Sequence, residues 1–449
     1  MDGLIYNNVA INLAEGEGGM WHLTHSPSLF ADFAEHPPLA IWLMSVFYSF
    51  FGKSWLVASA YNLLVFILTC LLIVFLWRSM GYGWANGWLP LLLWLLVPAV
   101  TQNACDGMLE CTMALFVLGA AVCFVRCDGD SWRDVVRATT AGVLLLGAFL
   151  CKGFTGLYVL VLPFVMWLGY RLLPDGKTQG FGRMACVTVV ALAVMLFGYA
   201  VMWLAMPGMG DYMARYISHQ VMGGIANVQV ERWYIVGKFF QNVAIVLCIC
   251  VLGVALLAKK GCVNGRGIGV SRDDWRNFMV YMLLALCGVL PIMISLKQRG
   301  FYILTVYPFV ALAAGAVVRN VDFTKAEKTG TVVMWFVALI SLAAAVAFNV
   351  KNFGKPQRNA VMLDDMTLIA AQLDRGERVG MPYDMRTEYS LVGYYYRAKR
   401  IDLMPLARVG EEENLPTHLI SDGRDMTEFD AFYREINLNT KQYKLFLLK

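Results

Sequence analysis

Apolar runs long enough to cross a bilayer recur along most of the chain. A membrane-spanning helix needs about 20 predominantly apolar residues. Runs of this kind occupy residues 55–77, 84–101, 108–125, 184–206, 235–258, 278–296, 302–320 and 331–350. A further stretch, residues 136–173, is interrupted by Lys152-Gly153 and predicts two short spans, which brings the expected total to ten.

Two shorter helices are expected before the first of these spans. Asp2 is followed by Tyr6, Ala10 and Leu13 and then by Gly16 and Gly18, a spacing that predicts an amphipathic helix that ends at glycine. Residues 39–51 are apolar but too short to span a bilayer, and they begin directly after Pro37-Pro38. Such a segment favours a helix lying in the membrane interface.

The last hundred residues have a different composition. Residues 351–449 hold 15 of the 37 Lys and Arg residues of the chain. They predict a helix near residues 362–375 and short strands at residues 378–381, 390–396, 418–421 and 444–448. We therefore expect a small soluble α/β domain over 351–449, following a membrane domain over 1–350 in which residues 1–54 form a loop.

Composition supports a polytopic membrane protein. Hydrophobic residues make up 59% of the chain and charged residues only 15%, with a mean hydropathy of +0.57. A typical soluble domain has about 25% charged residues. The net charge of +5 is spread over many short loops and forms no basic face. These values exclude a soluble enzyme, a disordered protein and a protein that binds nucleic acid.

Lysine and arginine are concentrated in alternate loops, which predicts the orientation because such residues favour the cytoplasmic side. The basic loops lie near residues 78, 126–137, 171–183, 259–276 and 319–328. Residues 1–38 contain neither Lys nor Arg and are expected on the outer side. The other outer segments are the loops at 101–107 and 207–234, the turn at 297–301 and the tail after residue 350.

An outer location for residues 1–38 requires something to carry them across the membrane. No signal peptide is visible in the sequence. We expect a further transmembrane helix ahead of Met1, which gives eleven in all; insertion of an uncharged N-terminus after synthesis is the alternative.

Carboxylates gather in the outer segments. Asp2 begins the first predicted helix, and Glu35-His36 precedes the two prolines. Asp106 lies in a short loop, and Glu110, one turn later, is expected on the same helix face. An ionisable side chain held at the membrane surface is a candidate for function. The alternative, purely structural interpretations are a helix cap for Asp2 and Asp106 and a solvated loop for Glu35-His36.

Cations on the outer side run against the orientation rule and need a reason. Lys152 interrupts an apolar stretch, and Lys297 and Arg299 lie in the turn that leads to Tyr302. Cations at headgroup depth suit the binding of a lipid phosphate, with snorkelling as the alternative. The loop at 207–234 adds a weaker polar set. Acids and cations together indicate chemistry on a phosphate-bearing lipid.

The order of these motifs over residues 1–350 resembles the GT-C glycosyltransferases that use polyprenyl-phosphate sugars. The resemblance is to the bacterial branch related to the protein O-mannosyltransferases and to the lipid A aminoarabinose transferase. The matching positions are Asp2, Tyr6, Gly16, Glu35-His36-Pro37-Pro38-Leu39, Asp106, Lys152-Gly153, Lys297, Arg299, Tyr302 and Pro308. One departure is Gly3, where many relatives carry a second acid.

The resemblance implies an all-α GT-C membrane domain with a small α/β domain on the periplasmic side of a bacterial inner membrane. It implies inverting transfer of a sugar from undecaprenyl phosphate to a lipid, glycan or protein acceptor in the cell envelope. Lys152, Lys297 and Arg299 would then stabilise the leaving phosphate, and Asp2, or else Asp106, would act as general base towards a hydroxyl acceptor.

The resemblance also implies substrate binding by Tyr6, Glu35, His36 and Tyr302. No cofactor is expected, and a divalent metal ion on Asp2, Asp106 and Glu35 is left open. Two other functions remain alternatives. A transporter or flippase of a lipid-linked saccharide would carry repeats and charges near the bilayer midplane. A glycan polymerase or ligase would use a diphosphate-linked donor.

Overall fold

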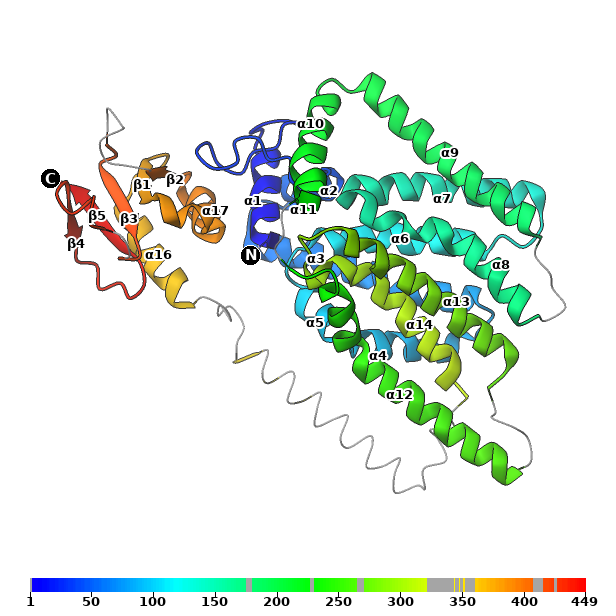
Figure 1. Cartoon of the computed structure of the whole chain (residues 1–449). Helices are drawn as coiled ribbons and strands as arrows, with labels where there is room; N and C mark the ends of the chain where they lie inside the picture. Colours follow the sequence, from blue (N-terminus) through cyan, green and yellow to red (C-terminus); the bar gives the residue numbers. More distant parts are fainter. Residues whose placement is uncertain are drawn as a thin grey trace.

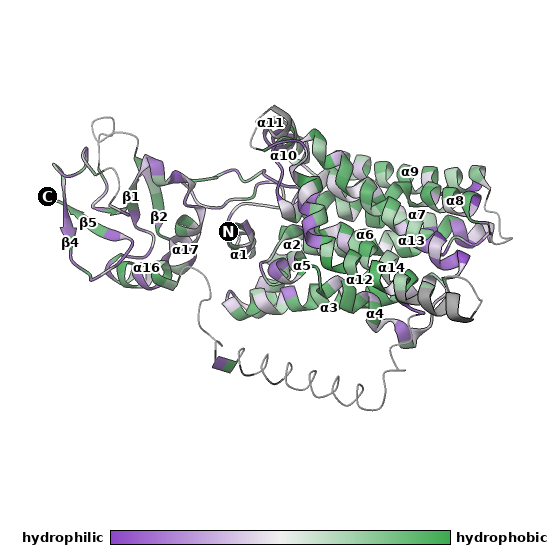
Figure 2. Ribbon diagram, turned by 60° about the horizontal axis from the view of Figure 1, so that its bottom comes forward, coloured by the Kyte–Doolittle hydropathy of each residue, from purple (hydrophilic) through white to green (hydrophobic). Residues whose placement is uncertain are grey.

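The computed structural model describes residues 2–174, 180–226, 230–264, 270–320, 343, 347, 350–351, 360–406, 415–423 and 426–449. A bundle of helices forms one part of the molecule, and a small α/β unit lies at the end of the bundle that carries helix α1 (Figure 1). Apolar residues dominate the bundle, whereas polar residues are frequent in the α/β unit (Figure 2).

The bundle is built from helices of unequal length. The long helices are α3 (Trp55–Ser79), α6 (Leu109–Val125), α7 (Ser131–Lys152), α9 (Phe181–Ala205), α12 (Tyr234–Asn264) and α13 (Arg272–Val289). The shorter ones are α1 (Asp2–Ala14), α2 (Leu39–Phe51), α4 (Trp88–Leu95), α5 (Pro98–Asn103), α8 (Leu162–Leu172), α10 (Met209–Tyr216), α11 (Gly223–Ala226) and α14 (Tyr307–Val318). Short turns of helix link them: η1 (Trp84–Asn86), η2 (Gly153–Val161), η3 (Ile217–Met222), η4 (Leu290–Ile294) and η5 (Gly300–Val306).

Within the described part of the chain, six helical segments are long and apolar enough to cross a membrane. They are Trp55–Ser79, Ser131–Leu172, Phe181–Ala205, Tyr234–Ala255, Arg272–Ile294 and Gly300–Val318. The protein is therefore a membrane protein with a largely helical bundle, as expected. The helices α1 and α2 also begin and end close to their predicted positions.

The number of long spans is smaller than the ten expected, for identifiable reasons. Residues 84–101 do not form one helix, because Pro98 follows an extended residue, Val97, and starts α5 anew. Helix α6 has only 17 residues and is shorter than a usual span. The run at 331–350 lies outside the described residues, apart from isolated positions.

The break at Lys152-Gly153 reverses the chain. The Asp134 carboxylate near the start of α7 accepts a hydrogen bond from Arg183 near the start of α9 (2.7 Å), so both helices begin on the same side. Helix α8 must therefore return to that side, and residues 136–173 make two passes as predicted. Gly153 has φ +72°, and a Cβ there would overlap the Tyr216 hydroxyl, so the reversal requires glycine.

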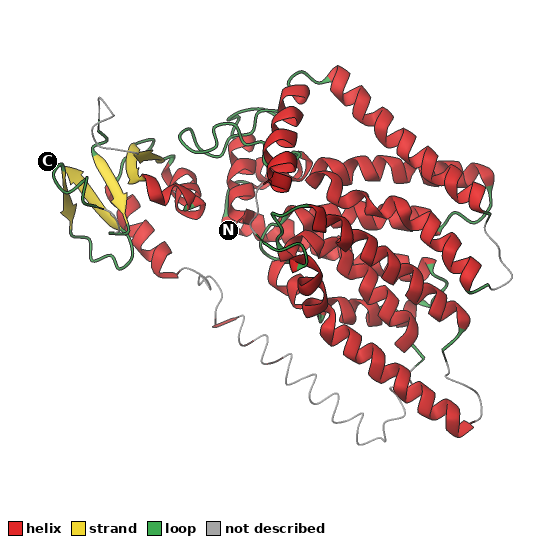
Figure 3. Ribbon diagram, viewed as in Figure 1, coloured by secondary structure: helices red, strands yellow, loops and turns green. Residues whose placement is uncertain are grey.

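The α/β unit is a five-stranded sheet with the order β2-β1-β3-β5-β4 (Figure 3). Its strands are β1 (Arg378–Pro382), β2 (Asp402–Leu406), β3 (His418–Ser421), β4 (Tyr433–Ile436) and β5 (Lys444–Leu448). β1 pairs in parallel with β2 and β3, while β5 pairs antiparallel with β3 and β4. The accompanying helices are α16 (Ala360–Gln372), the turn η7 (Tyr383–Thr387) and α17 (Tyr389–Lys399).

Three of the four predicted strands and the predicted helix are present, but the strand expected at 390–396 is wrong. This segment forms α17, in which Leu391, Val392, Tyr395 and Tyr396 are buried. Their spacing of one, three and one residues is that of one helix face. The run of tyrosines suggested a strand because aromatic residues favour sheets, and packing overrode that preference.

Polar contacts join the α/β unit to the segment between α1 and α2. The Ser28 hydroxyl donates to the Asp402 carboxylate (2.6 Å), and the Tyr396 hydroxyl donates to the Glu17 carboxylate (2.8 Å). Arg400 pairs with Glu15 and Glu17. The α/β unit therefore holds the loop that leads from α1 to α2.

Candidate functional site

A cavity of about 700 Å³ opens in the bundle near the end that carries α1. It is bounded by η2, by α10, η3 and α11, by the end of α13 with η4, and by the turn before η5. Its polar lining consists of His36, Lys152, Thr155, Tyr158, Tyr216, Gln220, Ser295, Lys297 and Tyr302. Its apolar lining includes Phe154, Val161, Val221, Leu290, Pro291, Ile292 and Ile294.

The apolar part of this cavity reaches the surface of the bundle. Phe154, Leu290 and Ile294 are exposed over 56%, 50% and 62% of their areas. The polar part is closed, since Lys152 is only 5% exposed. The cavity therefore offers charged groups at a buried end and a wall of exposed apolar side chains at the other.

Helix α1 is held tightly against the turn that contains Asp106. A Cβ on Gly3 would overlap the backbone carbonyl oxygen of Asp106. Next to this contact, the Asn7 amide donates to the Gly3 carbonyl (2.6 Å), and the Tyr48 hydroxyl donates to Asn7 (2.5 Å). The close approach explains why a second acid is absent after Asp2: position 3 has no room for a side chain.

We expect Gly3→Ala to push α1 away from the turn that contains Asp106. Forcing atoms into a filled site costs about 1–3 kcal/mol, and here the opposing atom is backbone that cannot rotate away. Gly19→Ala is the matched control, because a Cβ at Gly19 meets nothing within 4 Å. Thermal unfolding of the purified variants in detergent checks this, with a lower Tm expected for Gly3→Ala alone. Equal Tm values for the two variants would contradict the tight contact.

Lys152 lies at the buried end of the cavity, surrounded by one carboxylate and several rings. Its ammonium forms an ion pair with Glu110, whose side chain is fully buried. The ring centroids of Tyr302, Phe301 and Tyr6 lie 5.1, 5.2 and 6.0 Å from Lys152 Nζ. Aromatic faces attract a cation. Lys152 is thus positioned as a desolvated cation facing the cavity.

His36 lies beside Tyr6, and Glu35 interacts electrostatically with the same tyrosine. The His36 ring packs edge-on against Tyr6 at 5.6 Å. Burial lowers the pKa of His36 well below its usual value, and the ammonium groups of Lys152 and Lys297 lower it further. Burial raises the pKa of Glu35, which Lys297 partly offsets. His36 is therefore neutral at pH 7 and can exchange hydrogen bonds without adding a charge.

Lys297 and Tyr302 line the same cavity, but Arg299 does not. The Lys297 ammonium donates to the Gln220 side chain (3.4 Å). Arg299 is exposed and acts electrostatically on Tyr302 from outside the lining. The turn at 297–302 thus contributes one cation to the cavity and keeps the second at its rim.

The two candidate acids occupy different places. Asp2, at the start of α1, interacts electrostatically with Tyr6 and Glu35. Asp106 lies in the turn before α6, with its backbone against Gly3, and neither Asp2 nor Asp106 is part of the cavity lining. The expectation that Asp106 and Glu110 share one helix face is wrong, because α6 begins only at Leu109.

Sequence reasoning left several cavity residues unassigned. Tyr216 and Gln220 are four residues apart and face the cavity from the polar segment at 207–234. The sequence indicated Tyr216 only weakly, as one of a polar set in this segment, and gave no indication of Gln220. Glu110 was expected to be an acid at the membrane surface next to Asp106, and nothing in the sequence indicated that it is buried with Lys152 as its partner.

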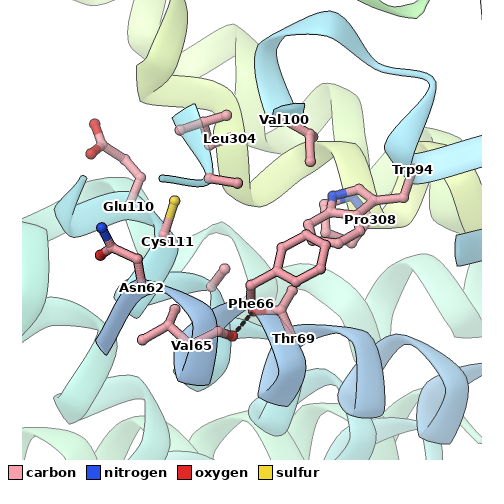
Figure 4. Close-up of a pocket in the computed structure, with 12 residues that line it drawn as sticks. Asn62, Val65, Phe66, Thr69, Trp94, Val100, Glu110, Cys111, Leu304 and Pro308 are labelled. Carbon is pink, nitrogen blue, oxygen red and sulfur yellow. Dashed lines mark hydrogen bonds between the residues drawn. The ribbon is translucent and has the colours of Figure 1, made fainter. Parts of the chain in front are cut away.

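A second, small cavity of about 30 Å³ lies behind Glu110. It is mostly apolar and includes the rings of Phe66 and Trp94. The Glu110 carboxylate is turned away from these rings (Figure 4). This acid reaches the large cavity only through its partner, because Glu110 pairs with Lys152, which is part of that lining.

No group of three or more His, Cys, Asp or Glu side chains in the described residues could hold a metal ion. Asp2, Asp106 and Glu35, which the sequence left open as a metal site, do not form such a group.

Comparisons with known proteins identify the fold of this chain. Neither a family model nor a curated protein matches the sequence. Among solved structures, ArnT from Cupriavidus metallidurans bound to undecaprenyl phosphate matches with a TM-score of 0.66 and 14% identity, over 99% of this chain and 93% of that one. The apo state of the same protein gives 0.64 and 13%, over 99% and 92%.

A more distant match extends the comparison beyond bacteria. It is the archaeal oligosaccharyltransferase AglB from Archaeoglobus fulgidus, in complex with an inhibitory peptide and a dolichol-phosphate. Its TM-score is 0.51 at 11% identity, over 94% of this chain and 65% of that one. The fold expected from the motifs is confirmed: the chain has the GT-C fold.

Proposed function

We propose that this protein transfers a sugar from a polyprenyl phosphate carrier to an acceptor at the outer face of the membrane. The supporting observation is the cavity of about 700 Å³ with Lys152 and Lys297 in its polar lining and apolar side chains exposed at the bundle surface. Its chemistry fits an amphipathic ligand with an anionic head and an isoprenoid tail. The undecaprenyl phosphate bound to ArnT has this chemistry.

The cations would supply the main electrostatic assistance. Breaking the bond between sugar and phosphate leaves charge on the phosphate oxygens, and a preformed cation in a dry site stabilises that charge strongly. Lys152 and Lys297 would contact the phosphate, with Arg299 at the rim and Tyr302 between them. Neutral His36 and Tyr6 would orient the donor headgroup.

The acids would act on the acceptor side. Asp2 is the first choice for a general base, since it lies among Tyr6 and Glu35 at the start of α1. Asp106 is the second choice, acting on an acceptor or holding α1 in place. A phosphate acceptor would need no base, and the acids would then orient it.

The domain and location assignments belong to the same proposal. Residues 1–350 would form the transferase domain in a bacterial inner membrane, and residues 351–449 would form a periplasmic domain that supports the first loop. The basic loops on the opposite side support this orientation.

Mass spectrometry of lipids, surface glycans and proteins tests the function. Cells with the gene, without it, and with Asp106→Asn are compared. Loss of a sugar-sized mass from one acceptor in both the deletion and the variant supports transfer and identifies that acceptor. Accumulation of a lipid-linked saccharide in the deletion, with no acceptor losing a sugar-sized mass in the Asp106→Asn variant, would instead indicate a transporter. Activity only with a diphosphate-linked donor would indicate a polymerase or ligase.

A further inference from the structure

We infer that Glu110 is an internal counter-ion that limits how tightly the cavity holds an anionic headgroup at Lys152. This inference rests on the function proposed above and assigns a positioning role to an acid that the proposed chemistry does not use. Glu110 acts through Lys152, by competing for its ammonium.

The contacts of Lys152 support this role. The two side chains come from α6 and the end of α7, and they are 0% and 4% exposed. In the part of the chain that the structure describes, the other neighbours recorded for the ammonium are the rings of Tyr6, Phe301 and Tyr302. An anion that enters the cavity at Lys152 must therefore share this cation with Glu110.

The contacts of Glu110 show that its charge is only partly compensated. One carboxylate oxygen pairs with Lys152, while the other, Oε2, is buried without a hydrogen-bond partner among the described residues. A buried ion pair repays its desolvation only when the remaining lone pairs are also satisfied. Glu110 is therefore poorly explained as a purely stabilising partner.

The physical consequence is a repulsion between Glu110 and a bound phosphate. Like charges a few ångströms apart interact strongly where water is excluded. The donor lipid carries a sugar on its phosphate, and the released lipid carries a free phosphate monoester with more negative charge. Both headgroups are anionic, so Glu110 weakens the binding of both and of the released lipid phosphate most. Weaker ground-state binding prevents the product from occupying the site after transfer.

Binding of undecaprenyl phosphate to the full chain in nanodiscs of neutral lipid tests this inference. We expect Glu110→Gln to lower the Kd at least about tenfold, because one buried like charge is removed. Lys152→Gln is expected to raise the Kd. Glu435→Gln, in the exposed Lys444–Glu435 pair, is the matched control and leaves the Kd unchanged. Inorganic phosphate at equal concentration is the second probe; displacement of the lipid by it would show that the head alone is recognised.

A double variant keeps the test decisive if Glu110→Gln fails to fold. Glu110→Gln with Lys152→Gln removes both buried charges, and its Kd is expected to be lower than that of Lys152→Gln alone. An unchanged or higher Kd in both comparisons overturns the inference. If the wild type binds the lipid and only Lys152→Gln changes the Kd, the proposed function stands while the role of Glu110 falls. Absence of binding by the wild type overturns both.

Discussion

Lys152→Gln is expected to lower kcat/KM for sugar transfer by about a thousandfold, the effect of removing one preorganised electrostatic contact to a developing anion. Lys152 is the most deeply buried cation in the cavity lining and faces three aromatic rings. Water cannot replace its charge there. A transfer assay with purified protein and polyprenyl-phosphate sugar measures the effect.

The same change also leaves Glu110 buried without its cation, which costs about 3–5 kcal/mol of stability. Folding and chemistry are separated by adding Glu110→Gln, which removes the second charge. We expect the double variant to regain much of the Tm while transfer stays at the low level. Lys444→Gln is the matched control: it breaks an exposed Lys–Glu pair and changes stability by no more than about 0.5 kcal/mol. Transfer within tenfold of wild type by Lys152→Gln would remove this residue from the reaction.

Asp2→Asn is expected to lower kcat by about 10²- to 10⁴-fold, the usual contribution of a general base. Asp2 interacts electrostatically with Tyr6 and Glu35, and the Asp106 backbone lies against Gly3; neither acid is part of the cavity lining. We expect Asp106→Asn to abolish transfer with the protein still expressed, and Asp2→Asn to lower kcat at an unchanged Tm.

The pH profile of kcat distinguishes a base from a residue that only orients the acceptor. If Asp2 accepts a proton, Asp2→Asn removes the acidic limb of the profile; if Asp2 only orients a phosphate acceptor, KM rises and the limb remains. Asp430→Asn, at an exposed position of the α/β unit, is the control and leaves kcat and Tm unchanged. Full activity of Asp2→Asn would exclude Asp2 from catalysis.

Much of the fold follows from local patterns in the sequence. Apolar runs, paired prolines and glycines are local signals, and they predicted the bounds of α1 and α2 and the break at Lys152-Gly153. Local signals misjudged residues 84–101, where Pro98 starts a new helix within an apolar run. They also misjudged 390–396, where burial of one helix face outweighed the strand preference of tyrosine.

The candidate site was predicted as a set of residues but not as an arrangement. The sequence selected Lys152, Lys297, His36 and Tyr302 because charged or polar groups are costly at membrane depth, and these four line one cavity. The other selected residues lie outside that lining: Asp2, Tyr6, Glu35, Asp106 and Arg299. A rule based on charge and depth identifies costly residues but gives no direction for a side chain.

The sequence by itself determined that this chain is a membrane protein with a helical bundle, a basic and a non-basic set of loops, and a polar α/β unit at its end. These properties depend on how much apolar surface each segment carries, which is a local quantity. Tertiary structure alone decided that Glu110 pairs with Lys152 and that α1 packs through Gly3 against the turn that contains Asp106. Those contacts join residues 42 or more positions apart in the chain. They form only when the packing of several helices removes water and brings the two partners together.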